Sequence, residues 1–432
     1  MLNGVVAEMS VEVVGVIIAV VALAVGSVAA YAALRSNWFE GTTQSQQEFR
    51  DTRRHLKEHR PALVSLAAKL HTSTANGPIL IPRTQLLSFP HWLPAAPAPL
   101  DAVTLIWAGG KAPRAPQKIS RFARRVLPVS DNRRRFDSYS QALGAIARPT
   151  LFFDNPTFSL TAADWSDPAS PRLTFSESRY FPTIDIAEAL CHELAVAAVQ
   201  GPEEEVRQPT WRSLPLRRAL RSQLLNPALR PISIAVSTLL IRRQPNGDAE
   251  FFLNLRDPEA TVTFAGAYMV VPTGVFQPGS KSPAALREDF DIWRTIMREF
   301  SEEILGNPEA DGTMGMTVDY ATETPYLELD QERAAGKIRL HYLGFGLDAV
   351  ELWGHLLTVM VVEDDAFSRV APTLVEKNAE GIMIGHKRTK TGVRGIPLVS
   401  EEVDYYLSAG MMSSPSAACL ALGWQHRNVL LN

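Results

Sequence analysis

The sequence has few cysteines and almost no excess of charge. Its only cysteines among 432 residues, Cys191 and Cys419, lie far apart and form no metal-binding or redox motif. We therefore predict two buried thiols in a reducing compartment rather than a disulfide bond. The 43 Lys and Arg against 46 Asp and Glu give a net charge of −3. That balance excludes a global attraction to nucleic acid, so no nucleic-acid partner is expected.

One long run without charge stands at the N-terminus. Residues 13–34 contain no acidic or basic side chain and are long enough as a helix to cross a bilayer. The basic segment that begins a signal peptide is missing, because Glu8 and Glu12 precede the run without any Lys or Arg. Arginines follow the run from Arg35 onward. The positive-inside rule then predicts a single-pass cell-membrane anchor, with the N-terminus outside and residues 35–432 in the cytoplasm.

The positions of proline, glycine and strand-like runs predict an α+β chain in four parts. These are a transmembrane anchor (1–36), a juxtamembrane helix interrupted near Pro61 with a proline-rich linker (37–100), a small mixed α/β domain (101–228), and a larger domain (229–432). The larger domain opens with an apolar strand and the hairpin signal Asn246-Gly247. The small residues Ala22, Gly26 and Ala30 are spaced four apart, and a homodimer is one expectation from that spacing.

Two features in the small domain suggest function but have simpler explanations. Residues 121–136 hold six arginines, which could contact phosphates or a membrane surface or could form a solvated basic face. His192-Glu193 resembles half of a zinc-protease helix, but Val196 stands where the second histidine would be. We interpret His192 and Glu193 as structural.

A group of three glutamates lies on one predicted helix in the larger domain. Apolar residues recur every four positions at Ile292, Ile296, Phe300 and Ile304 and define a buried face. Glu299, Glu302 and Glu303 are three and four positions apart, so they converge near one edge of the helix. Their repulsion needs an offset, which Arg294 and Arg298 or a divalent cation could supply. The pattern alone leaves open a solvated face or a metal site.

The residues Arg298-Glu299-Phe300-Ser301-Glu302-Glu303, with the preceding loop 271–279, resemble the box motif of the Nudix hydrolases. Gly274 is the nearest counterpart of the first glycine of that box. The sequence departs from the box in three places. Phe290 replaces a glutamate, and the loop after Gly274 is ten residues longer than in the box. The last glycine of the box comes one position late, at Gly306, because Leu305 occupies its expected place. The two domains together also resemble a group of uncharacterised actinobacterial proteins.

The resemblance implies a fold, a site and a reaction. The fold would be an α/β/α sandwich with a mixed sheet. Glu299, Glu302 and Glu303 would bind Mg²⁺ or Mn²⁺, Arg298, Glu302 and Glu303 would be catalytic, and Gly274 would belong to the substrate loop. The general base of this family often comes from a later loop. The candidates for it here are Glu363, Glu376 and Glu380, and the sequence does not favour one of them over the others.

Three functions follow as expectations. The first is a membrane-anchored cytoplasmic hydrolase that cleaves the pyrophosphate of a nucleoside diphosphate-linked small molecule. The second is a Nudix-fold nucleotide sensor with weak or no activity. The third is a membrane-tethered adaptor that uses residues 102–200 for partners. The sequence does not identify the substrate, because loop side chains set it.

Overall fold

The structure is a computed structural model, and it describes residues 42–432 apart from 75, 151, 202, 258–265, 309–316, 378–380, 385–386, 390–391 and 409. The predicted anchor at residues 13–34 lies outside the described residues. Among the helices in the described range, none is both long and apolar enough to cross a bilayer. The 19-residue α5 (Tyr180–Ala198) contains three acidic residues, Asp185, Glu188 and Glu193. The described structure therefore does not support the prediction of a single-pass cell-membrane protein.

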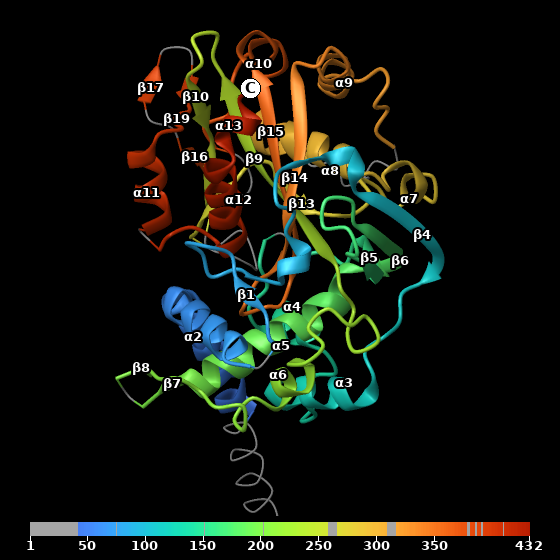
Figure 1. Cartoon of the computed structure of the whole chain (residues 1–432). Coiled ribbons are helices and arrows are strands. Elements are labelled where there is room, and N and C mark those ends of the chain that lie inside the picture. The colour runs from blue at the N-terminus through green and yellow to red at the C-terminus, as the bar shows by residue number, and fades with distance from the viewer. Residues whose placement is uncertain are drawn as a thin grey trace, which may run out of the picture.

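A curled sheet of nine strands forms the centre of the molecule (Figure 1). Its order is β1-β2-β14-β15-β9-β10-β19, with β13 pairing β9 and β3 pairing β14. The strands are β1 (Ile79–Leu80), β2 (Leu87–Ser88), β3 (Ala98–Pro99), β9 (Ile234–Arg243), β10 (Ala249–Phe251), β13 (Thr273–Val275), β14 (Ile338–Leu347), β15 (Gly354–Glu363) and β19 (Ile396–Pro397). The central strands β9 and β15 are parallel and almost continuously buried, as their uninterrupted apolar runs predict.

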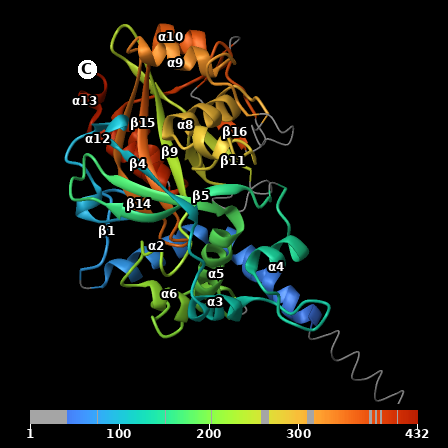
Figure 2. The same cartoon turned by 90° about the vertical axis from the view of Figure 1, so that its right-hand side faces the viewer.

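Both faces of the sheet are covered by helices (Figure 2). Successive residues of β9 point to opposite faces, so Leu240 packs in one apolar cluster and Leu239 and Ile241 pack in the other. On the face of Leu239, α12 (Ser414–Gln425) packs against β9, β14 and β15. On the other face, α8 (Ile292–Glu299) packs against β9 and β13. The site described below lies on this second face.

The predicted fold class, with a transmembrane helix and a linker outside a separate α/β/α sandwich, is wrong. The described chain is a mixed α+β structure in which β1, β2 and β3, from the stretch predicted as a linker, pair with the central sheet through β2–β14 and β3–β14. Backbone pairing also joins the regions on either side of residue 229, because Leu160 N donates to Ile232 O at 2.7 Å. The limits predicted for the four domains stay a prediction.

The remaining elements surround this core. The other strands are β4 (Thr104–Lys111), β5 (Pro156–Asp164) and β6 (Arg172–Arg179) in one sheet, β11 (Leu253–Arg256), β12 (Tyr268–Val270) and β16 (Gly381–Ile384) in another, and the pairs β7 (Val199–Gln200) with β8 (Glu205–Val206) and β17 (Lys387–Thr389) with β18 (Gly392–Arg394). The other helices are residues 42–58, α2 (Arg60–Thr72), α3 (Gln117–Ala123), α4 (Tyr139–Ile146), α6 (Pro215–Leu220), α7 (Ala285–Glu288), α9 (Tyr326–Ala334), α10 (Asp364–Val370), α11 (Ser400–Ser408) and α13 (Arg427–Leu430), with 3₁₀ turns η1 (Pro90–Trp92), η2 (Leu100–Ala102) and η3 (Arg124–Val126).

Several local predictions are confirmed. The helix before Pro61 ends at Glu58 and restarts at Arg60, and Asn246-Gly247 forms the turn between β9 and β10. Both cysteines are free and buried. Glu193 is structural, because its carboxylate accepts from Leu216 N at 2.7 Å and Arg217 N at 2.9 Å and so caps α6.

Candidate functional site

The glutamates lie where one helix changes its geometry. Asp291 begins α8, and its carboxylate accepts hydrogen bonds from Trp293 N at 2.7 Å and Arg294 N at 3.3 Å. The predicted apolar face is buried against the core. After Glu299 the helix continues as the π-helical turn η4 (Phe300–Ile304). Such turns often occur at functional sites, and this one contains Glu302 and Glu303.

Glu303 joins the helix to the sheet. Its side chain is buried, and its Oε2 atom accepts a hydrogen bond from Thr273 N at 2.8 Å. Thr273 is the first residue of β13, which pairs with β9. One carboxylate oxygen of Glu303 is therefore engaged by the backbone beside Gly274.

Gly274 lies directly against Glu299. A Cβ atom placed on Gly274 would be 1.8 Å from Glu299 Oε1. The absence of a side chain at Gly274 thus leaves the space that the Glu299 carboxylate occupies. This close approach gives a steric reason for glycine at the position that matches the first glycine of the box.

Arg298 links the acidic helix to the preceding loop. Its buried guanidinium donates to Gln277 O at 2.6 Å through Nη2, and it pairs with Asp289 Oδ1 at 3.1 Å. Nη1 also donates to the Tyr320 hydroxyl. Burial alone would lower the pKa of Arg298, but Tyr320 and Asp289 outweigh it and the pKa is raised. Arg298 therefore stays charged and holds the loop against α8.

Asp289 is the residue that the sequence did not single out. It is buried, its Oδ2 atom accepts from Gly279 N at 2.8 Å, and its Oδ1 atom accepts from the Tyr320 hydroxyl at 2.6 Å. Burial raises the pKa of Tyr320, which keeps that hydroxyl protonated as a donor. Asp289 thus fixes the long loop at Gly279 and pairs with Arg298. Three acidic residues surround Phe290 in sequence, and nothing in their pattern distinguishes Asp289.

Phe290 itself belongs to an aromatic cluster. Its ring centroid lies 5.2 Å from that of Phe158, 5.3 Å from Trp107 and 5.7 Å from Phe276. A glutamate at this position would place a carboxylate among these rings. The departure from the box at Phe290 is therefore explained by packing against strands β4 and β5.

A small cavity opens beside the glutamates. Its volume is about 20 Å³, which is room for one or two water-sized species. The lining residues come from α8 and η4, from the loop after β13, and from the start of β5: Asn155, Pro156, Gln277, Pro278, Gly279, Ser280, Lys281, Arg298, Glu299 and Glu302. Two carboxylates, a lysine and a loop backbone therefore face one enclosed space.

The donor set of this cavity fits a hard divalent cation. Mg²⁺ is usually bound by one or two protein carboxylates and keeps several waters and phosphate oxygens, which is what Glu299 and Glu302 can offer. Within the described residues, two groups bring three donor atoms within 4.8 Å of one another, and the three box glutamates are not one of them. Glu303 is thus better placed to hold the helix than to complete a ligand set.

The three candidates for a general base lie elsewhere or outside the described residues. Glu363 Oε2 pairs with Arg243 at 3.0 Å at the end of β15, and neither Glu363 nor Glu376 lines the cavity. Glu380 lies outside the described residues. Their catalytic role stays untested.

Comparison with known proteins gives little support. No family model matches the chain. No curated protein matches it either. Among solved structures, the crystal structure of RenU, a Nudix hydrolase from M. smegmatis, is similar over 46% of this chain and 85% of that chain, with 14% identity and a TM-score of 0.19. A TM-score this low carries no argument, so the motif resemblance rests on the residues themselves.

Proposed function

We propose that the chain is a Nudix-type hydrolase that cleaves the pyrophosphate of a nucleoside diphosphate-linked small molecule with Mg²⁺ or Mn²⁺. The observation that carries the proposal is the buried pairing of Arg298 with Gln277 O and Asp289. This pairing holds the loop over the acidic helix, and Glu299 and Glu302 line the space between them.

Each residue has a distinct part in this proposal. Glu299 and Glu302 would hold the cation, which supplies neutralisation of phosphate oxygens and a more acidic water. Glu303 positions the helix on Thr273, and Gly274 leaves room for the Glu299 carboxylate. Lys281 is exposed at the cavity and offers a positive charge to a phosphate. Arg298 is a positioning residue for the loop and for Glu299.

The test uses the full chain with Mg²⁺ or Mn²⁺ and a panel of ADP-ribose, NAD, dinucleoside polyphosphates and nucleoside triphosphates. Products are separated by chromatography for the parent protein and for Glu299→Gln and Glu302→Gln. Glu288→Gln is the matched control, because Glu288 is exposed just before α8 and does not line the cavity. Cleavage by the parent and the control, with loss in both cavity variants, is expected. Equal cleavage by all four proteins would exclude these carboxylates.

A nucleotide sensor is the second candidate, and two observations favour it. One oxygen of Glu303 is engaged by Thr273, and the three glutamates do not converge within 4.8 Å. A sensor would show a rise in melting temperature with one compound of the panel and no product. In the presence of Mg²⁺ or Mn²⁺, Glu302→Gln would then weaken the binding of that compound.

A further inference from the structure

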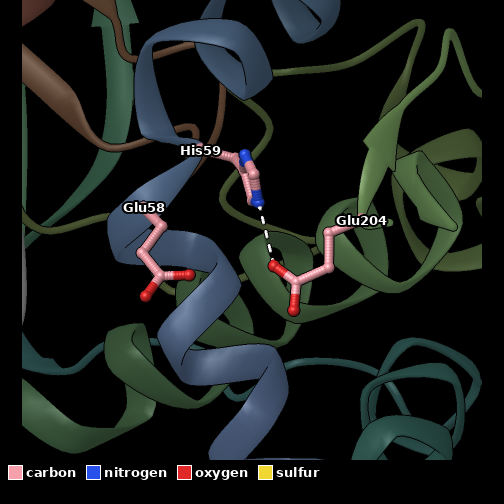
Figure 3. A group of neighbouring side chains, drawn as sticks. All are labelled: Glu58, His59 and Glu204. Carbon is pink, nitrogen blue, oxygen red and sulfur yellow. Dashed lines mark hydrogen bonds and ion pairs between the residues drawn. The ribbon is translucent and has the colours of Figure 1, made fainter. Parts of the chain in front are cut away.

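We propose that Glu58, His59 and Glu204, with His55 beside them, form a binding site for Zn²⁺ or a similar transition metal. Figure 3 shows the three residues that converge, with His59 pointing toward Glu204. The site shares no residue with the acidic cavity. It therefore stands independently of the proposed hydrolase.

The break between the two N-terminal helices creates the position of His59. The first helix ends at Glu58, and α2 starts at Arg60 with Pro61 in its first turn. Proline has no N–H to donate and its ring crowds the preceding turn, so the two helices meet at a joint rather than running on. His59 lies at that joint with φ −105° and ψ 13°. The joint turns Glu58 and His59 toward the turn between β7 and β8, which carries Glu204.

The donor atoms already lie close together. One ligand atom from each of Glu58, His59 and Glu204 lies within 4.8 Å of the other two. His59 Nε2 is 3.3 Å from Glu204 Oε2, and His55 Nε2 is 3.1 Å from Glu204 Oε1. Donors bound tetrahedrally to Zn²⁺ at about 2.0–2.1 Å are about 3.3 Å apart. The His59–Glu204 pair needs almost no movement, and Glu58 has to move only by rotation of an exposed side chain.

The donor types decide which ion fits. Imidazole nitrogen combined with carboxylate oxygen suits Zn²⁺, Co²⁺, Ni²⁺ and Cu²⁺, whereas Mg²⁺ and Ca²⁺ prefer oxygen alone. His59 is 26% exposed and Glu204 is 29% exposed, so an ion can reach both side chains from solvent. The site thus differs in chemistry from the cavity of Glu299 and Glu302, which offers carboxylates and no imidazole.

Arg54 now occupies the place of a cation. Its Nη1 atom lies 2.6 Å from Glu58 Oε2, and its Nη2 atom lies 2.7 Å from Glu204 Oε1. The Arg54 side chain is 44% exposed, so its guanidinium can rotate into solvent. A metal ion would take its place between the two carboxylates. Arg54 is therefore a built-in competitor, and its removal should strengthen metal binding.

The test is calorimetric titration of the chelator-treated full chain, prepared without a histidine tag, with Zn²⁺ in the presence of excess Mg²⁺, which occupies the carboxylate cavity of Glu299 and Glu302. The parent should bind one Zn²⁺ per chain, and His59→Ala and Glu204→Gln should each weaken binding by at least about tenfold. Arg54→Gln should tighten it. His91→Ala, which removes another exposed histidine, should leave the affinity unchanged.

Two results would overturn the proposal. One is that the parent does not bind Zn²⁺, or that the parent, His59→Ala and Glu204→Gln all bind it with the same affinity. The other is weaker binding in Arg54→Gln, because that result would place the ion away from the two carboxylates. Circular dichroism of each variant establishes that the fold is retained, and Zn²⁺ should raise the melting temperature of the parent and not of His59→Ala.

Discussion

Two groups of buried charged side chains differ in what surrounds them. In the candidate functional site, Arg298 pairs with Asp289, and the neighbouring Glu299 and Glu302 line a cavity. A second group, here called the α5 charge cluster, consists of Arg53, Arg60, Glu188, Asp348 and Glu351. In it Arg53 pairs with Glu188, and Arg60 pairs with Glu351 at 2.8 Å.

The two groups differ in whether their carboxylates border a cavity. Glu188 and Glu351 are 2% and 1% exposed, and each lies against an arginine from the N-terminal helices. They lie near Cys191 with donor atoms within 4.8 Å, but the arginines supply the positive charge that a metal ion would bring. The α5 charge cluster holds two helices to α5 and the loop of Asp348. In the candidate functional site, Glu299 and Glu302 instead line a cavity of about 20 Å³.

The largest expected effect is on the α5 charge cluster. Glu188→Ala leaves Arg53, whose side chain is 14% exposed, without its carboxylate partner. Removal of one member of a buried ion pair typically destabilises by about 3 kcal/mol or more. Urea unfolding followed by circular dichroism measures this loss, and Glu188→Gln should lose less because it retains a hydrogen-bond acceptor. A loss below about 1 kcal/mol in Glu188→Ala would contradict a structural role.

The next effect is a dependence of stability on pH. Burial raises the pKa of Glu351 from 4.5 to about 7, despite the neighbouring Arg60. Between these two values the folded chain keeps a proton that the unfolded chain has released. The contribution of Glu351 to the free energy of unfolding is therefore present at low pH and falls by up to about 3 kcal/mol as pH rises to 7 and above.

Glu351→Gln tests that contribution, because glutamine is neutral at every pH. The variant should be more stable than the parent at pH 8, and its free energy of unfolding should fall less steeply between pH 5 and 8. Parallel pH curves for parent and variant would show that Glu351 is ionised throughout.

A smaller effect on stability, with a clear effect on activity, is expected at Gly274. The added methyl group of Gly274→Ala would displace the flexible end of Glu299 rather than the backbone, because the three nearest atoms all belong to that side chain. We expect a loss of stability below about 1 kcal/mol and a loss of activity of at least about tenfold. Gly144→Ala is the matched control, since its Cβ would meet Phe152 at an ordinary 3.7 Å. Full activity in Gly274→Ala would remove Glu299 from the proposed site.

The smallest effect is expected for a charge pair on the surface. Arg124 Nη2 lies 2.7 Å from Asp137 Oδ1, and both side chains are more than half exposed, at 51% and 77%. Exposed pairs contribute little because water and salt screen them. Arg124→Ala should shift the melting temperature by less than the scatter of repeated measurements. A clear shift would mean that the arginine-rich stretch 121–136 has a packing role.

Patterns within one element were readable from the sequence. The spacing of Ile292, Ile296, Phe300 and Ile304 predicted the buried face shared by α8 and η4. Asn246-Gly247 predicted the hairpin between β9 and β10. Pro61 marked the break between the first two helices. Each of these signals depends on neighbours a few residues apart, where local geometry decides the outcome.

Contacts between distant segments were not readable in the same way. Asp289 could not be separated from Glu288 and Asp291, because its role depends on Tyr320 and on where Gly279 lies. His59 and Glu204 are 145 residues apart, and their meeting depends on how α2 and α5 pack. The short strands within residues 79–99 were not predicted, because the prolines of this stretch indicate a loop. β2 and β3 form by pairing with β14, which lies more than 230 residues later in the sequence.

The order of strands in the central sheet also constrains how the protein is made. β1 and β2 leave the ribosome early, whereas β14, the partner of β2 and β3, begins about 250 residues later at Ile338. The parallel strands β9 and β15, which pair with each other, lie 120 residues apart in the sequence, from Ile234 to Gly354. Because such long-range pairings form slowly, apolar strand edges stay open while synthesis continues. The nascent chain should therefore depend on chaperones that shield these edges until β15 has emerged.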